Sequence, residues 1–209
     1  MNSTIEAVRR VALSRGAQLW AHAGLAGLFY VRPNLATNKS AVIASNHTSV
    51  MDSVVAINIM ASFDRPWHVQ ADDQMISRFH LLYDGVYLPV GSDKVETARA
   101  LTQVRRLLIA DSDRIVWTYP QGDHFRASSK LMTHRGPTRL TSGSTDFWSA
   151  WISYEVFRST RPTAAVGFHY VGTGKVNQAA MDDGLLQARY AAEDLMRRRI
   201  TTVRKTFGD

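Results

Sequence analysis

The 209-residue sequence contains no cysteine. This absence excludes disulfide bonds, thiolate metal sites and cysteine nucleophiles, and it fits the reducing environment of the cytoplasm. No run of about 18 consecutive apolar residues occurs, so the sequence predicts no membrane-spanning helix. The longest apolar stretch, residues 19–31, is interrupted by His22. We therefore expect a cytoplasmic protein that contacts membranes only at their surface.

Several functional motifs are missing as well. The sequence has no Gly-x-Ser-x-Gly elbow, which argues against a serine hydrolase, and neither a Walker loop nor a dinucleotide fingerprint. We expect no metal ion or other cofactor, since four histidines have no partner at metal-ligand spacing: His22, His68, His80 and His169.

Positive charge is in excess. Lysine and arginine number 25 against 18 aspartates and glutamates, a formal net charge of +7. Such a balance favours an anionic partner, which could be nucleic acid, an anionic lipid headgroup or a phosphorylated substrate such as coenzyme A. No interleaving of aromatic and basic residues supports nucleic-acid binding. We expect contact with the inner face of the cell membrane and no nucleic-acid partner.

Residues 1–33 predict an amphipathic helical segment, with a helix over residues 5–31 that ends before Pro33. Three polar residues interrupt the apolar core that a secretory signal peptide would need: Ser14, Arg15 and Gln18. Three aromatic residues favour the membrane–water interface: Trp20, Phe29 and Tyr30. The helix either lies on the membrane or packs against the core, and the sequence leaves both possibilities open.

Strand and helix patterns alternate along the rest of the chain. Apolar runs predict strands at residues 41–45, 67–71, 86–90, 114–119 and 164–171. Helical spacing predicts helices over 51–61, 94–110 and 179–204. We predict a single α/β domain over residues 1–209, a sandwich with a central, mostly parallel sheet flanked by helices. Functional sites in such sheets collect at the carboxyl ends of the strands.

Two segments with reactive side chains follow predicted strands. In the first, His47 comes just after a strand and Asp52 stands at the expected start of a helix. The carboxylate can orient the imidazole and leave its other nitrogen to accept a proton from an alcohol. A helix cap is the structural alternative for Asp52. In the second segment, a buried strand runs into the turn Pro120-Gln121-Gly122, which could bind an anion or serve as a plain connection.

Four aromatic residues near the middle of the C-terminal half follow helical spacing: Phe147, Trp148, Trp151 and Tyr154. We expect them to belong to the core, with an aromatic wall beside an acyl-chain groove as the alternative.

Together the two segments resemble the conserved blocks of the glycerolipid acyltransferase superfamily, of the 1-acylglycerol-3-phosphate acyltransferase type. Asn46-His47 and Asp52 are similar to its His-x4-Asp block, and Tyr119-Pro120-Gln121-Gly122 is similar to its Phe-Pro-Glu-Gly block. Residues 85–90 resemble its intermediate block, and 134–136 and 164–171 match later steps. Order and spacing agree over residues 41–171, which is most of the chain.

The resemblance implies acyl transfer from acyl-CoA or acyl carrier protein to a hydroxyl group of a lysophospholipid-like acceptor. It assigns His47 as general base and Asp52 as its orienting partner, with no metal. It also implies substrate contacts from residues around both motifs: Asn46, Ser49, Lys94, Pro120, Gln121, Gly122, His124 and Arg126.

The chain departs from the family pattern at acceptor positions. Gly91 stands where the intermediate block has an arginine, Gln121 replaces a glutamate, and His124 replaces an arginine. Lys94 and Arg126 are the nearest cations. The acceptor therefore stays open between lysophosphatidic acid or a related lysophospholipid and another amphipathic hydroxyl, such as a glycolipid or carotenoid. A catalytically inactive lipid-binding relative is a further alternative.

Overall fold

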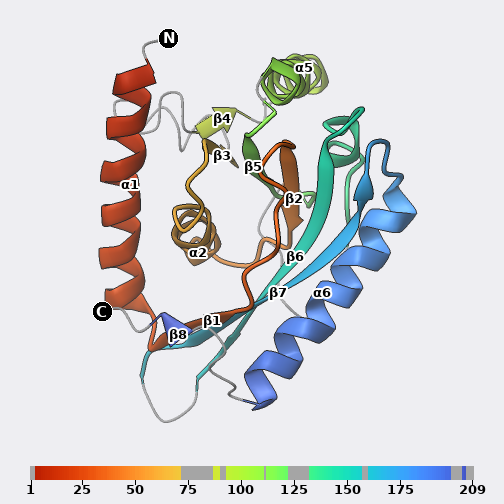
Figure 1. Cartoon of the computed structure of the whole chain (residues 1–209). Helices are drawn as coiled ribbons and strands as arrows, with labels where there is room; N and C mark the ends of the chain where they lie inside the picture. Colours follow the sequence, from red (N-terminus) through yellow and green to blue (C-terminus); the bar gives the residue numbers. More distant parts are fainter. Residues whose placement is uncertain are drawn as a thin grey trace.

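One sheet of eight strands runs through the molecule, with helices on both of its faces (Figure 1). The computed structural model describes residues 3–71, 87–89, 93–110, 112–121, 132–156, 160–198 and 204–205. For residues 3–6, 71, 87–89, 94 and 204–205 the description extends to the backbone alone. The sheet and its flanking helices confirm the alternating α/β pattern predicted from the sequence.

The helices are α1 (Ser3–Gly24), α2 (Met51–Met60), α5 (Lys94–Ala110) and α6 (Gln178–Arg198), with a short 3-10 turn η1 (Pro137–Arg139). The strands are β1 (Gly27–Tyr30), β2 (Ala41–Ser45), β3 (Trp67–Ala71), β4 (Tyr87–Pro89), β5 (Ile115–Thr118), β6 (Asp146–Glu155), β7 (Thr163–Thr173) and β8 (Arg204–Lys205).

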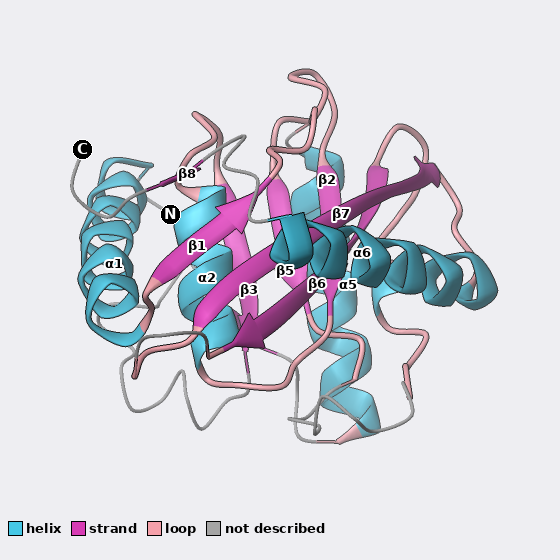
Figure 2. Cartoon of the chain, turned by 90° about the horizontal axis from the view of Figure 1, so that it is seen from below, coloured by secondary structure: helices cyan, strands magenta, loops and turns pink. Residues whose placement is uncertain are grey.

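The strand order is β4-β3-β5-β2-β6-β7-β1-β8, and the strands lie side by side as one layer (Figure 2). The neighbours β4-β3, β3-β5, β5-β2, β2-β6 and β7-β1 are parallel. Only β6-β7 and β1-β8 pair antiparallel within the described sheet. The predicted sandwich with a mostly parallel central sheet is therefore confirmed.

Strand β2 shows why the sheet is covered on both faces. Its five residues are all buried, and alternate side chains point to opposite faces. Ala41 and Ile43 join a core cluster with α1 and α2, whereas Val42 and Ala44 join a second cluster with α5 and α6. A continuous apolar run is typical of a parallel strand buried between two layers of helices.

The N-terminal prediction is correct only in part. Helix α1 ends at Gly24, and residues 27–30 form β1 rather than the last turn of a helix. Glycines at 24 and 27 weaken helix propagation. Leu28 and Tyr30 are buried in alternation with their neighbours, and β1 pairs with β7. Pairing with β7 stabilises the strand and overrides the local helical pattern.

The four aromatics have helical spacing in the sequence, but they lie on strand β6 and not on a helix. Phe147 and Trp151 face α6, while Trp148 and Tyr154 face the cluster of α1 and α2. Residues four apart share a face in a strand as well as in a helix, so spacing alone did not separate the two. The predicted place in the core is confirmed for Phe147 and Trp151, whereas Trp148 and Tyr154 are half-buried and pack against the core from its margin.

The C-terminal helix is shorter than predicted. Helix α6 ends at Arg198 within the described residues, and Arg204–Lys205 pairs with β1 as the edge strand β8.

Helix α6 lies unusually close to β7 at Gly167. A Cβ atom on Gly167 would stand 2.0 Å from the carbonyl oxygen of Ala188 and 2.4 Å from the amide nitrogen of Ala192. The alanines on the facing side of the helix complete this close approach of two backbones.

We predict that Gly167→Ala lowers the free energy of unfolding by about 3 kcal/mol, because the new methyl group meets backbone that cannot move aside. Gly16→Ala is the matched control, since nothing lies within 4 Å of a Cβ there. Gly16→Ala should raise the free energy of unfolding by up to about 1 kcal/mol, because alanine has the higher helix propensity. Urea unfolding of both variants checks this, and equal midpoints would contradict the close contact.

Candidate active site

The two reactive segments meet at one edge of the sheet. Strands β2 and β5 are parallel neighbours, with Ala44 beside Thr118, so both chains leave the sheet at the same end. His47 follows β2, and Gln121 follows β5. The Gln121 side-chain oxygen accepts a hydrogen bond from the His47 backbone N–H at 2.5 Å. Residues 74 positions apart in sequence are thus held together directly.

His47 and Asp52 form a close pair. The distance from His47 Nδ1 to Asp52 Oδ2 is 3.2 Å. The histidine side chain is 14% exposed and the carboxylate is fully buried. With the proton on Nδ1, the ring donates to Asp52, and Nε2 is the acceptor on the side away from the carboxylate. This is the geometry of an oriented general base.

Asp52 also shapes the loop that carries the histidine. Its Oδ2 accepts the backbone N–H groups of Thr48 at 2.6 Å and Ser49 at 2.9 Å. Ser49 in turn accepts the N–H of Met51 through its side-chain oxygen at 3.1 Å. The helix-cap alternative for Asp52 is wrong: Val50 is the N-cap residue of α2 without a side-chain cap, and Asp52 binds N–H groups of the loop before the helix.

Tyr154 completes the surroundings of the carboxylate. Its hydroxyl donates to Asp52 Oδ1 at 2.7 Å from strand β6. Burial, followed by the negative charge of Asp52 and this hydrogen bond, raises the pKa of Tyr154 well above its usual value. The phenol therefore stays protonated and donates. Sequence reasoning missed this role of Tyr154, because the residue lies 102 positions from Asp52 in the chain.

Tyr119 holds the plane of the imidazole. Its ring stacks on the His47 ring with centroids 4.1 Å apart and planes 18° apart. Its hydroxyl donates to Ser53 Oγ at 3.4 Å. The aromatic residue directly before the Pro-Gln-Gly turn thus packs against the histidine. The imidazole ring is held by stacking on one of its faces and by the hydrogen bond at Nδ1.

Asn46 ties the loop to β6. Its amide nitrogen donates to the Ile152 carbonyl at 2.9 Å, and its oxygen accepts the Ile152 N–H at 2.7 Å. The residue is 1% exposed, so both ends of this amide are engaged by the protein itself. Pro120 is buried as well, and its carbonyl accepts the N–H of His134 at 2.7 Å.

The remaining residues predicted to contact substrate have no described side chain. Gly122, His124 and Arg126 lie outside the described residues, as does Gly91. Lys94 is the first residue of α5 and is described by its backbone alone. Among the described residues, no group of three or more His, Cys, Asp or Glu side chains could hold a metal ion.

The family is identified by a sequence model for acyltransferases, which matches residues 29–146. This is more than half of the chain, and it contains both segments that meet at His47. The chain belongs to the acyltransferase family. None of the curated proteins compared matches this acyltransferase in sequence.

A solved structure shows the same fold. The 1-acyl-sn-glycerophosphate (LPA) acyltransferase PlsC from Thermotoga maritima superposes with a TM-score of 0.58 at 16% identity. The match covers 93% of this chain and 79% of PlsC. The Legionella pneumophila ATPase DotB matches at a TM-score of 0.35 and 10% identity, over 81% of this chain and 59% of its own, which is too weak to carry an argument. The predicted membership in the glycerolipid acyltransferase superfamily is confirmed.

We predict that Tyr154→Phe lowers the free energy of unfolding by roughly 2 kcal/mol near neutral pH, since it removes a hydrogen bond to a buried carboxyl group. The raised pKa of Tyr154 means that the wild-type advantage is complete below pH about 10, where the unfolded tyrosine is protonated. Above that pH the unfolded state loses its proton, so the advantage falls.

Urea unfolding of both proteins from pH 7 to pH 11 measures this difference. Tyr190→Phe, at an exposed position on α6, serves as the control and should differ little from wild type. A gap between wild type and Tyr154→Phe that widens above pH 10 would contradict the buried, donating phenol.

Proposed function

We propose that this acyltransferase moves a fatty acyl group from an acyl-CoA or acyl-carrier-protein thioester to a hydroxyl of a lysophospholipid-like acceptor. The observation that carries the proposal is the pair of His47 and Asp52, 3.2 Å apart, at the carboxyl edge of a parallel sheet. The carboxylate of Asp52 is buried, the plane of the His47 ring is held by Tyr119, and a small fraction of the His47 side chain is exposed. These three properties together suit a general base.

In the proposed reaction, His47 Nε2 removes the proton of the acceptor hydroxyl while its oxygen attacks the thioester carbonyl carbon. Asp52 stabilises the imidazolium that forms. The tetrahedral intermediate then collapses, the carbon–sulfur bond breaks, and the departing thiolate takes the proton back from the imidazolium. The products are an ester and a free thiol, and no acyl-enzyme is required.

Gln121 supports this chemistry although it replaces the glutamate of the family block. Its side chain is 6% exposed and its oxygen accepts the His47 backbone N–H. An amide oxygen accepts this bond as a carboxylate oxygen would, so the catalytic loop stays anchored without the charge. We infer that the substitution changes the electrostatic potential offered to the acceptor rather than the position of the base.

The acceptor is proposed as lysophosphatidic acid or a related lysophospholipid. Gly91, Gln121 and His124 remove charges that the family uses near the acceptor. These differences also favour the second candidate, an amphipathic hydroxyl without a glycerol phosphate, such as a glycolipid or carotenoid.

A membrane-surface position is supported by the outer side of α1. None of the described helices has the length and apolar character needed to cross a bilayer. Yet α1 leaves large apolar side chains in solvent: Val8 is 65% exposed, Val11 56%, Leu19 71% and Trp20 62%. Arg15 is exposed on the same helix. Apolar and aromatic side chains with a nearby cation are typical of helices that lie in the interface of anionic membranes. We propose peripheral binding at the inner face of the cell membrane.

We predict that His47→Ala lowers thiol release from palmitoyl-CoA or palmitoyl carrier protein, with a panel of lysolipids and amphipathic alcohols, by roughly 10²–10⁴-fold. His169→Ala on β7 is the matched control and should keep its rate. Circular dichroism shows whether each variant is folded. Equal turnover by wild type and a folded His47→Ala variant would exclude the general-base role, and mass spectrometry of the products identifies the acceptor.

We predict that the double variant Leu19→Gln/Trp20→Gln binds vesicles containing phosphatidylglycerol at least roughly tenfold more weakly, because two apolar side chains no longer enter the interface. Ile109→Gln, an equally exposed apolar position on α5, is the control. Co-sedimentation measures bound protein. Unchanged binding of the double variant would assign the outer side of α1 another role.

A further inference from the structure

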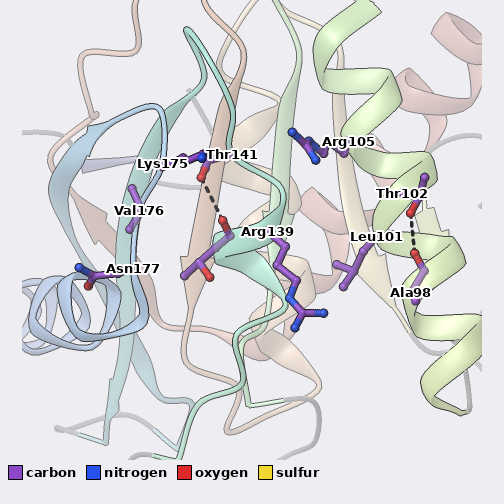
Figure 3. A pocket seen from close by; sticks show the side chains of 10 residues that line it. Ala98, Leu101, Thr102, Arg105, Arg139, Thr141, Lys175, Val176 and Asn177 are labelled. Carbon is purple, nitrogen blue, oxygen red and sulfur yellow. Dashed lines mark hydrogen bonds between the residues drawn. The ribbon is translucent and has the colours of Figure 1, made fainter.

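An open cavity of about 730 Å³ lies between α5, residues 138–141 and residues 175–177 (Figure 3). The last of these walls follows β7, which ends beside the first residue of β6, and β6 begins beside the first residue of β2. His47 follows the opposite end of β2. The groups placed to control the imidazole are therefore those packed around the His47–Asp52 pair. One of them, Tyr154, belongs to neither reactive segment.

The two oxygens of the Asp52 carboxylate have different partners. Oδ2 meets His47 Nδ1 at 3.2 Å and accepts the backbone N–H groups of Thr48 and Ser49. Oδ1 accepts the Tyr154 hydroxyl at 2.7 Å, its single partner among the described residues. The Asp52 carboxylate is fully buried, so solvent does not replace that partner. The phenol thus satisfies the second oxygen of a buried carboxylate.

The position of Tyr154 is set by backbone pairing outside the catalytic loop. Strand β6 continues past the last residue of β2, and the Asn46 side chain binds both the N–H and the carbonyl of Ile152. Tyr154 lies two residues further along β6 and therefore on the same face as Ile152, toward α1 and α2. The other donors to Asp52 come from the loop before α2. Tyr154 is therefore the anchor of this carboxylate on the sheet.

The phenol bears on which oxygen faces the imidazole. The terminal torsion of an aspartate is broad and nearly two-fold, so rotation can exchange the two carboxylate oxygens. With Tyr154 on Oδ1, Oδ2 is left for the Nδ1–H group of His47, and Nε2 stays unprotonated. Without the phenol a buried oxygen loses its donor, which favours rotation or protonation of the Asp52 carboxylate. Either change weakens the hydrogen bond that selects the tautomer.

We propose that Tyr154 is a positioning residue for acyl transfer: its hydroxyl holds Asp52 in the orientation that keeps His47 protonated at Nδ1 and basic at Nε2. The inference rests on the proposed function, in which Nε2 accepts the proton of the acceptor hydroxyl. Tyr154 acts through Asp52 and exchanges no proton with the substrate. Burial, followed by the negative charge of Asp52, raises the pKa of Tyr154 well above its usual value, so the phenol remains a donor near neutral pH.

Steady-state kinetics of Tyr154→Phe with palmitoyl-CoA and oleoyl lysophosphatidic acid test the proposal. We expect kcat to fall roughly 10- to 100-fold with KM within about twofold of wild type, because the lost hydrogen bond reaches a charged group but not the substrate. Tyr170→Phe is the matched control, since its hydroxyl bonds to Thr173 near the end of β7, and it should keep the wild-type kcat. An unchanged kcat in folded Tyr154→Phe contradicts the role. A higher kcat contradicts it as well, since the phenol would then be weakening the carboxylate.

A double-mutant cycle tests whether Tyr154 acts through Asp52. In an Asp52→Asn background, Tyr154→Phe should change kcat by less than about twofold, because the carboxylate that the phenol orients is already gone. A loss as large as in the wild-type background would show that Tyr154 acts by another route. Circular dichroism and urea unfolding establish that each variant is folded at the assay temperature.

NMR of protein labelled with ¹⁵N-histidine reads the tautomer directly and needs no turnover. The His47→Ala spectrum identifies the signals of His47. We expect neutral His47 to carry its proton on Nδ1 in wild type and to populate both tautomers in Tyr154→Phe. A wild-type ring protonated at Nε2 would refute the proposal without any variant, and an unchanged tautomer in the folded variant would refute it too.

This inference and the proposed function can fail separately. If Tyr154→Phe changes the His47 tautomer but wild type consumes no thioester with any acceptor of the panel, the orienting role stands and acyl transfer is refuted. If thiol release depends on His47 while Tyr154→Phe keeps both the tautomer and kcat, acyl transfer stands and the role of Tyr154 is refuted.

Discussion

The site depends on the buried carboxylate of Asp52. An isolated carboxylate in the interior costs several kcal/mol, so it persists only where its oxygens are satisfied. Here the N–H groups of Thr48 and Ser49, the ring of His47 and the hydroxyl of Tyr154 all face it. The same four contacts fold the loop after β2, orient the imidazole and bind that loop to β6. One carboxylate therefore sets the structure of the loop and the orientation of its histidine together.

The sheet makes this convergence possible. Residues from β2, β5 and β6 meet because β2 lies between the other two, parallel to both. Parallel strands bring the segments that follow them to one edge, which explains the contact of Gln121 with His47. The route of β6 is different: it continues past the end of β2, so that Ile152 and Tyr154 stand beside the loop. The site is therefore assembled from two strand ends and one strand interior.

Much of this arrangement could be predicted from the sequence, and its limits have physical reasons. Apolar runs located β2 and β5 because strands buried on both faces leave a continuous signal. The contribution of Tyr154 could not be predicted, since it depends on register between strands far apart in the chain. Residues 27–30 were predicted as helix because β1 is stabilised by pairing with β7, which no local pattern encodes. Asn46 and Gln121 were predicted at the site, but their hydrogen bonds to backbone required the fold.

Gln121 shows how the turn after β5 can hold the His47 loop without a charge. Its side-chain oxygen accepts a hydrogen bond from the His47 backbone N–H, and this bond needs an acceptor atom but no charge. The acceptor molecule, by contrast, responds to the potential of nearby charges over several ångströms. Replacing a glutamate with a glutamine therefore leaves the geometry of the base in place and alters the electrostatics outside it. The contacts that orient the imidazole run through Asp52, Tyr119 and Tyr154, so they do not depend on a charge at position 121.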